Sequence, residues 1–204
     1  MRRLRTRSFW APAAFHSRDS LALDKPTVSI RSHLTTKPAR LHLTMFTLLL
    51  SAELTGVTNL RPDDTQDNPF WYMFKVQCTS CRETHANYIG VNRFEANDIS
   101  GSRGEANFVW KCKNCKRASS ASIIAAPAAY EQTEPPKSQK IIEFDCRGLE
   151  FVEFKAEGEW LAEGLDSGTK FTGIELVDGE WYEYDEKAGD EVSIKEIKWE
   201  IRRS

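Results

Sequence analysis

The sequence predicts a mainly β protein with a compact antiparallel β-sandwich or barrel-like fold, and three observations support this class. Apolar and polar residues alternate with period two in several short stretches, such as residues 70–77 and 141–146. Glycine and proline separate many of these stretches, as they do between strands. No long segment shows the apolar repeat of an amphipathic helix.

In the first half, we expect strands at residues 46–54 and 57–60, followed by a polar loop with proline at both ends. Residues 70–77 then form a strand, and shorter strands follow at 88–91, 108–112 and 122–126. The run Phe70-Trp71-Tyr72 could be a ligand-binding box. We interpret it instead as part of an aromatic-rich, half-buried strand, because aromatic residues favour that setting.

In the second half, strands are expected at residues 141–146 and 151–154. The dipeptide Asp178-Gly179 lies between residues 174–177 and 181–184 and predicts a hairpin that joins them. A last strand is expected over 192–201, where Ile197, Trp199 and Ile201 share one face. Residues 127–140 contain Glu134-Pro135-Pro136 and predict a linker.

Two Cys-x-x-Cys pairs carry the clearest chemistry in the chain. Cys78 and Cys81 form the first pair, Cys112 and Cys115 form the second, and 30 residues separate them. Each pair lies where an expected strand ends, so a tight turn there can present both sulfurs on one side. Four such thiolates suit one tetrahedral zinc ion, and an iron site is the alternative occupant. The sequence therefore predicts one zinc per chain, in a site that joins two knuckles.

Other interpretations of these cysteines fit less well. Disulfides would need an oxidising compartment, and we see no secretory signal in the sequence. A thioredoxin-like redox motif needs only one pair. The basic residues beside the knuckles (Arg82, Lys111, Lys113, Lys116 and Arg117) either offset the charge of about −2 on a four-thiolate zinc or form a solvated face.

Beyond residues 1–44 and the two pairs, the sequence holds one further cysteine and one histidine. Cys146 alternates with Phe144 in an expected strand, which predicts a buried structural thiol. His85 follows the first knuckle by four residues, but four cysteines already suffice for zinc. We find no catalytic acid–base pair and no nucleophile with a plausible base, so we predict no catalytic residues, no organic cofactor site and no enzymatic activity.

Charge is distributed unevenly along the chain. Residues 1–44 carry seven Arg and two Lys against two Asp, a net of +7, which leaves −9 for residues 45–204. We expect residues 1–44 to be a disordered basic leader that is either transit-like or upstream of a true start at Met45. We favour the second alternative, which predicts a cytoplasmic protein; a genuine transit peptide would make it mitochondrial.

The remaining chain is organised as a zinc-bearing β half at 45–126, the linker at 127–140 and an acidic β half at 141–204. The stretches Leu54-Thr55-Gly56-Val57 and Cys146-Arg147-Gly148-Leu149 both follow an expected strand, which suggests that the two halves are related. The acidic charge argues against nucleic acid as a partner. No apolar run is long enough for a membrane-spanning helix.

Several motifs together resemble the eukaryotic CXXC-motif-containing zinc-binding proteins over about 160 residues from Met45. They are Leu54-Thr55-Gly56-Val57-Thr58-Asn59-Leu60-Arg61-Pro62, both cysteine pairs, Gly101-Ser102-Arg103-Gly104-Glu105-Ala106-Asn107, Glu143-Phe144-Asp145-Cys146-Arg147-Gly148-Leu149-Glu150 and Tyr184-Asp185-Glu186-Lys187-Ala188. The resemblance implies one zinc held by Cys78, Cys81, Cys112 and Cys115 in a compact β protein with no established catalytic activity.

Three functional hypotheses follow. The first is a binding or adaptor module with a structural zinc and a protein partner, whose identity and the oligomeric state are left open. The second is metal handling or thiol redox chemistry, in which the thiolates pass on a metal or cycle with disulfides. The third is an RNA-binding zinc ribbon that uses Trp110 and the knuckle lysines, which the acidic charge disfavours.

Overall fold

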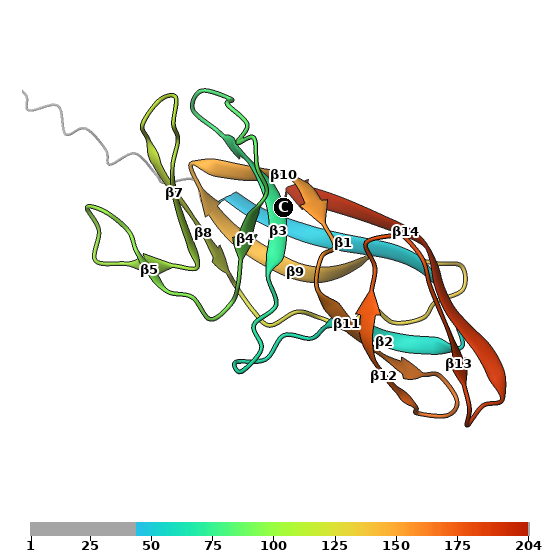
Figure 1. The fold of residues 1–204 in the computed structure, drawn as a ribbon. Helices are drawn as coiled ribbons and strands as arrows, with labels where there is room; N and C mark the ends of the chain where they lie inside the picture. The colour runs from blue at the N-terminus through green and yellow to red at the C-terminus, as the bar shows by residue number, and fades with distance from the viewer. Residues whose placement is uncertain (1–43, 204) are drawn as a thin grey trace, which may run out of the picture. The chain divides into compact units, whose positions relative to one another are not determined.

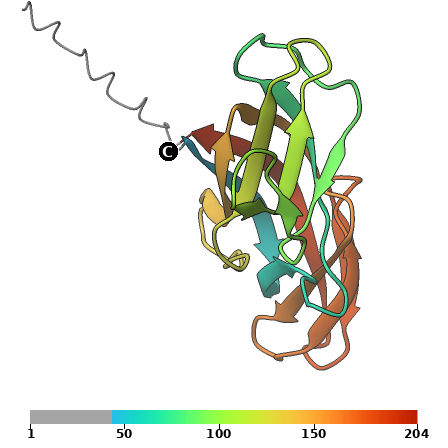
Figure 2. The ribbon, with the colours of Figure 1, turned by 90° about the vertical axis from the view of Figure 1, so that its left-hand side faces the viewer.

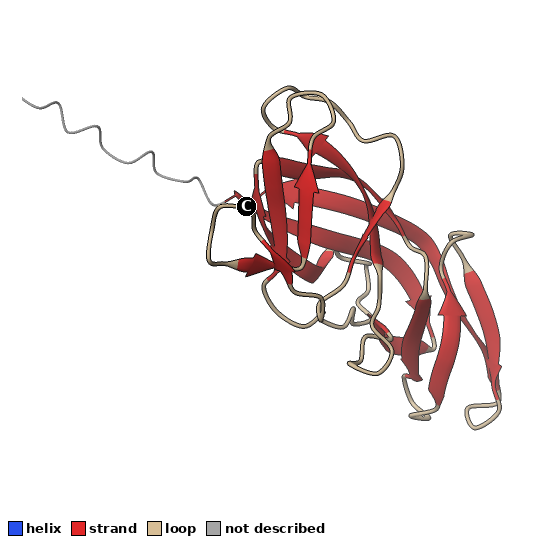
Figure 3. Cartoon of the chain, turned by 60° about the vertical axis from the view of Figure 1, so that its left-hand side comes forward, coloured by secondary structure: helices blue, strands red, loops and turns tan. Residues whose placement is uncertain are grey.

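The computed structural model describes residues 44–203, which lie within one unit of the chain, residues 40–204. Every regular element in this range is a β-strand, and every strand pair is antiparallel (Figure 3). The predicted all-β class is therefore confirmed. The leader predicted at residues 1–44 lies outside the described residues except for Thr44.

A six-stranded sheet forms the largest layer (Figure 1). Its strands, in spatial order, are β13 (Trp181–Asp185), β14 (Asp190–Arg203), β1 (Thr44–Thr55), β9 (Gln139–Arg147), β8 (Ala118–Ile123) and β7 (Phe108–Lys111). The long strand β1 lies between β9 and β14. Strands from 45–126 and from 141–204 therefore share one sheet, and the relatedness of the two halves stays a prediction.

A three-stranded sheet packs on one face of this layer. It consists of β10 (Leu149–Lys155), β3 (Tyr72–Cys78) and β4 (Ile89–Val91). The Phe74 ring of β3 lies 5.2 Å from Phe144 of β9 and 4.2 Å from Phe151 of β10. The alternation predicted for residues 70–77 is confirmed, because Tyr72, Phe74 and Val76 are buried between less buried neighbours. These rings form the centre of the core.

A second three-stranded sheet consists of β12 (Lys170–Glu175), β11 (Glu159–Gly164) and β2 (Val57–Pro62). The buried Trp160 of β11 meets Trp199 of β14 at a ring distance of 5.4 Å, which joins this sheet to the core. The short strands β5 (Asn97–Asp98) and β6 (Glu105–Ala106) pair with each other.

The chain leaves the six-stranded sheet in the same way at two places. Gly56 joins β1 to β2, Gly148 joins β9 to β10, and both glycines have positive φ, +68° and +78°. Each following strand belongs to a smaller sheet. The two similar sequence stretches therefore share a local conformation that favours glycine.

The hairpin predicted at Asp178-Gly179 is wrong. Residues 178–179 do form a turn, in which the Gly179 N–H donates to the Leu176 carbonyl. However, β12 pairs with β11 and β13 pairs with β14, so this turn carries the chain from one sheet to another. The observed hairpin is β13–β14, whose turn follows Asp185. Local turn chemistry gave the position of the reversal but could not give the pairing partner.

Residues 124–138 connect β8 to β9, so the linker predicted at 127–140 overlaps the start of β9, and the connection is attached to the core rather than free of it. Tyr130 is fully buried and forms a β-bridge with Leu60 of β2. Its hydroxyl also hydrogen-bonds to the backbone of Ala52 in β1. The prolines in this segment predict a linker, and no local pattern indicates that Tyr130 anchors it to the core.

Candidate metal centre

The first knuckle starts at the last residue of β3. The Arg82 N–H donates to the Cys78 carbonyl at 2.9 Å, and the Cys78 N–H donates to the Glu83 carbonyl at 2.9 Å. Arg82 has a φ of +61°, in the left-handed region. These bonds fold residues 78–83 into a closed turn in which Cys78 and Cys81 face the same way.

The second knuckle, between β7 and β8, repeats this geometry. The Lys116 N–H donates to the Cys112 carbonyl at 3.0 Å, and the Cys112 N–H donates to the Arg117 carbonyl at 3.0 Å. Lys116 has a φ of +62°, which corresponds to that of Arg82. The two loops lie side by side (Figures 1 and 2), although β3 and β7 belong to different sheets.

The four predicted cysteines are brought together. Their sulfurs all lie within 4.8 Å of one another, and the pairs Cys78–Cys115 and Cys81–Cys112 are each separated by 3.6 Å. A tetrahedral zinc with Zn–S bonds of about 2.3 Å has sulfurs about 3.8 Å apart. The observed separations thus fit a single four-thiolate zinc site. In residues 44–203 no other group of cysteine, histidine and carboxylate side chains clusters in this way.

The cluster is only half shielded from solvent. Cys78 and Cys112, the first cysteine of each knuckle, are fully buried, whereas Cys81 and Cys115 are partly exposed. Each knuckle therefore contributes one inner and one outer sulfur.

The environments of two of the sulfurs shift their pKa values in opposite directions. Burial opposes ionisation of Cys78, but hydrogen bonds from the Cys81 and Ser80 backbone N–H groups and from neighbouring thiols outweigh it and lower its pKa to about 7. At Cys115 the Arg117 N–H lowers the pKa, but burial and the other three sulfurs outweigh it and raise the pKa to about 11. Four thiolates repel one another, so a cation is needed to hold them all ionised.

Contacts beyond the sulfurs also fix the two knuckles. Arg117 of the second knuckle donates to the Ser80 hydroxyl of the first at 2.8 Å. The Gly148 carbonyl accepts the Thr79 N–H at 3.2 Å and the Ser119 hydroxyl at 3.0 Å, which joins the first knuckle to β8. Arg82 pairs with Glu150 of β10. Sequence reasoning missed these partners, because the residues in each contact are far apart in the chain.

The remaining cysteine, Cys146, and His85 both lie outside the cluster. Cys146 is buried in β9, as predicted, and burial followed by the charge of Asp145 raises the pKa of its thiol. The His85 ring contacts Asn87 and meets Trp110 edge to face, with ring centroids 6.1 Å apart. Neither residue belongs to the group of four sulfurs.

Fold and site together define an all-β protein with a four-cysteine metal centre held between two sheets. The family model described as "CXXC motif containing zinc binding protein, eukaryotic" matches residues 47–202. The chain belongs to this family, which confirms the resemblance inferred from its motifs.

Relatives and solved structures agree with this assignment. A UPF0587 protein of Schizosaccharomyces pombe is 47% identical over 159 residues, which cover 78% of this chain and 98% of the relative. The human CXXC motif containing zinc binding protein is 37% identical, over 74% of this chain and 92% of the relative. The crystal structure of C1orf123 is similar with a TM-score of 0.72 and 34% identity, over 78% of this chain and 99% of that chain. A hypothetical protein from Plasmodium falciparum, with a TM-score of 0.69 and 23% identity, shares the fold.

No helix in the described part of the chain is long and apolar enough to cross a membrane.

Proposed function

We propose that this protein is a non-catalytic binding module for a protein partner, and that a structural zinc held by Cys78, Cys81, Cys112 and Cys115 stabilises its fold. The observation that carries the proposal is the position of the two knuckles on strands of different sheets, with all four sulfurs within 4.8 Å. A metal bound there ties the two layers together at one edge.

The donor set supports a structural role over hydrolysis. Four protein thiolates fill the tetrahedral shell of zinc, and this leaves no coordination position for a water molecule or a substrate. Each sulfur comes from a rigid turn closed by backbone hydrogen bonds, so the site is preorganised. Arg82, Lys116 and Arg117 lie one or two residues after a cysteine in the sequence, and positive charge near the sulfurs would offset the charge of the thiolates.

The test is metal analysis of the purified protein, combined with thermal unfolding before and after chelation. We expect one zinc per chain and a large fall in melting temperature when the metal is removed, because binding to the folded state alone stabilises that state. A protein that keeps its fold and melting temperature after complete removal of zinc would contradict the structural role.

One observation favours a second candidate, metal handling or thiol redox chemistry. Cys81 and Cys115 are partly exposed, so a partner's thiol could approach the outer half of the cluster. Exchange of bound zinc with an isotopically labelled pool separates the two candidates. A structural site exchanges no faster than the protein unfolds, whereas a transfer site exchanges quickly from a folded chain.

A further inference from the structure

Trp71 is an exposed aromatic residue in an otherwise buried run. Its neighbours Phe70 and Tyr72 are buried, whereas 45% of Trp71 is exposed. The indole rests on β4, because an ideal Cβ at Gly90 would lie 2.7 Å from Trp71 Cε3. The ring is thus supported from the protein side and open to solvent on the other. A large aromatic surface held in this way is a typical anchor for a ligand.

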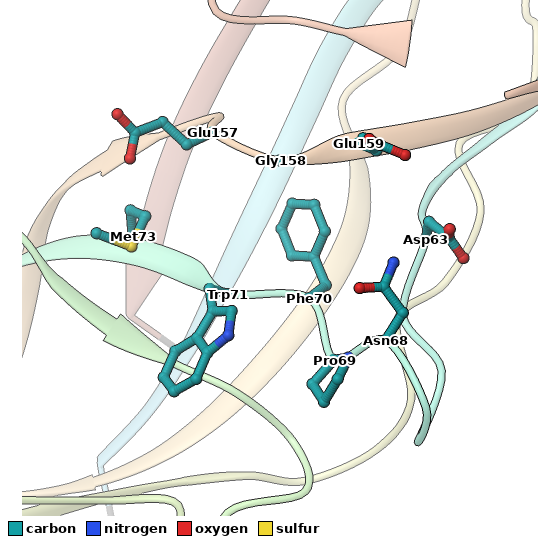
Figure 4. Close-up of a pocket in the computed structure, with 9 residues that line it drawn as sticks. All are labelled: Asp63, Asn68, Pro69, Phe70, Trp71, Met73, Glu157, Gly158 and Glu159. Atoms are coloured by element: carbon teal, nitrogen blue, oxygen red, sulfur yellow. The ribbon is translucent and has the colours of Figure 1, made fainter. Parts of the chain in front are cut away.

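Trp71 lines an open pocket of about 290 Å³ (Figure 4). Three segments form it: the residue after β2, the residues that lead into and begin β3, and the connection from β10 to the first residue of β11. Gly158 lies in one wall of the pocket, at a position with no room for a side chain. A Cβ there would lie 2.7 Å from the Phe70 ring, and the φ of Gly158 is +104°. Met73 and Pro69 add apolar surface beside the indole.

The pocket is strongly acidic. Three carboxylate residues line it, Asp63, Glu157 and Glu159, and none of its lining residues is basic. Glu157 pairs with Lys155, which lies outside the pocket. Within residues 44–203, the carboxylates of Asp63 and Glu159 have no ion pair or hydrogen bond from a side chain. Figure 4 shows these two side chains at one end of the pocket and Trp71 with Met73 at the other.

This combination selects a cation. An indole face attracts Arg or Lys through its quadrupole, and the unpaired carboxylates at the other end of the pocket attract the same groups. The carboxylates repel phosphate and other anions, and a purely apolar ligand would leave them unpaired. The pocket is open rather than enclosed, which suits a side chain that projects from an extended peptide.

We propose that this pocket binds a positively charged Arg or Lys side chain in an extended segment of a partner protein. The proposal rests on the proposed function as a binding module and names the chemistry of the partner. The pocket is formed by residues other than those of the metal centre, so the two can be tested separately.

The test uses the zinc-loaded full chain and a fluorescein-labelled peptide of alternating Arg and Gly, followed by fluorescence anisotropy. We expect saturable binding that weakens as salt rises, because exposed charge pairs are screened. Trp71→Leu, and separately the double variant Asp63→Asn/Glu159→Gln, should each weaken binding about fivefold or more. The Trp71 indole N–H resonance, assigned from its loss in Trp71→Leu, should shift on titration with the peptide.

Matched controls lie on β13, where Tyr182 is 56% exposed and Glu183 is exposed. Tyr182→Leu and Glu183→Gln should bind the peptide as the natural chain does. Equal binding by all variants would reveal general attraction to an acidic protein and overturn the proposal. Absence of peptide binding would also overturn the proposal. So would equally tight binding of free spermidine at Trp71, because that result would assign the pocket to a small cation.

Zinc content and melting temperature are measured for each variant. If the natural chain does not bind the peptide but holds one zinc whose removal lowers its melting temperature, only the pocket proposal is contradicted. A chain that binds the peptide but keeps its fold without zinc contradicts only the structural role of the metal.

Discussion

The Tyr130 hydroxyl satisfies both backbone groups of Ala52. The Ala52 N–H donates to the hydroxyl at 3.0 Å, and the hydroxyl donates to the Ala52 carbonyl at 2.8 Å. Ala52 lies at the irregularity in β1, where the register with β14 shifts between Ser51 and Glu53. One buried side chain from the connection between β8 and β9 thus replaces the missing ladder bonds of a central strand.

Tyr130→Phe should destabilise the protein by about 1–3 kcal/mol, because it leaves two buried backbone groups unsatisfied while the ring stays in place. Urea unfolding at equilibrium measures this change. Tyr184→Phe is the control, since Tyr184 is exposed, and should change stability little. A Tyr130→Phe protein as stable as the control would show that water or backbone adjustment satisfies Ala52.

Cys78→Ser should abolish stoichiometric zinc binding and lower the melting temperature to that of the chelated natural chain, because an alcohol is a poor zinc ligand. Cys146→Ala is the matched control: Cys146 is equally buried but lies outside the cluster, so its loss should leave the zinc content at one. Zinc measurement by atomic emission checks both. Loss of zinc in Cys146→Ala with retention in Cys78→Ser would refute the ligand assignment.

Lys116→Gly should be more stable than Lys116→Ala by about 1 kcal/mol, because residue 116 adopts a left-handed conformation that penalises any Cβ. Both variants lose the side-chain bond from Lys116 Nζ to the Lys113 carbonyl, so the comparison isolates the backbone effect. Thermal unfolding of the zinc-loaded variants is the measurement. Equal stability would mean that the metal-bound turn relaxes out of this conformation.

The bond from Arg117 to Ser80 links the two knuckles without metal. A double-mutant cycle with Arg117→Met and Ser80→Ala should give a coupling energy of about 0.5 kcal/mol, a small value because both residues are exposed. We expect the coupling to persist when zinc is bound. Strict additivity of the two substitutions would show that the contact contributes nothing to stability.

Asp185 links the β13–β14 turn to the loop after β11. Its carboxylate accepts hydrogen bonds from the Ser167 hydroxyl, the Thr169 hydroxyl at 2.8 Å and the Lys187 N–H at 3.0 Å. The bond from Ser167 is the main cause that lowers the pKa of Asp185, and burial opposes it.

A lowered folded-state pKa means that the stabilisation is present above the ordinary Asp pKa and is lost as pH falls through the folded value. Asp185→Asn should therefore be clearly less stable than the natural chain at neutral pH, and the difference should shrink below about pH 4. Unfolding measured from neutral to acidic pH checks this. A difference that does not vary with pH would mean that the carboxylate charge is irrelevant.

Much of this protein is determined by local sequence. Period-two alternation located β3 and β9, because a strand places alternate side chains on opposite faces. The two Cys-x-x-Cys pairs identified the four sulfurs of the cluster, because their spacing and the strand ends beside them suffice to form two matched turns. The burial of Cys146 followed from its position beside Phe144 in the same way.

Tertiary structure decided which strands pair and what supports the site. The turn at Asp178-Gly179 looks like a hairpin in sequence, yet β13 pairs with β14 instead, because long-range register depends on which apolar faces meet in the core. The bonds from Arg117 to Ser80 and from Tyr130 to Ala52 join residues 37 and 78 positions apart. Sequence by itself specified the four clustered cysteines and the approximate positions of many strands, although it missed β11 and misplaced β8 and β12 by about four residues. Only folding brought together partners so distant in the chain, since no local spacing encodes such contacts.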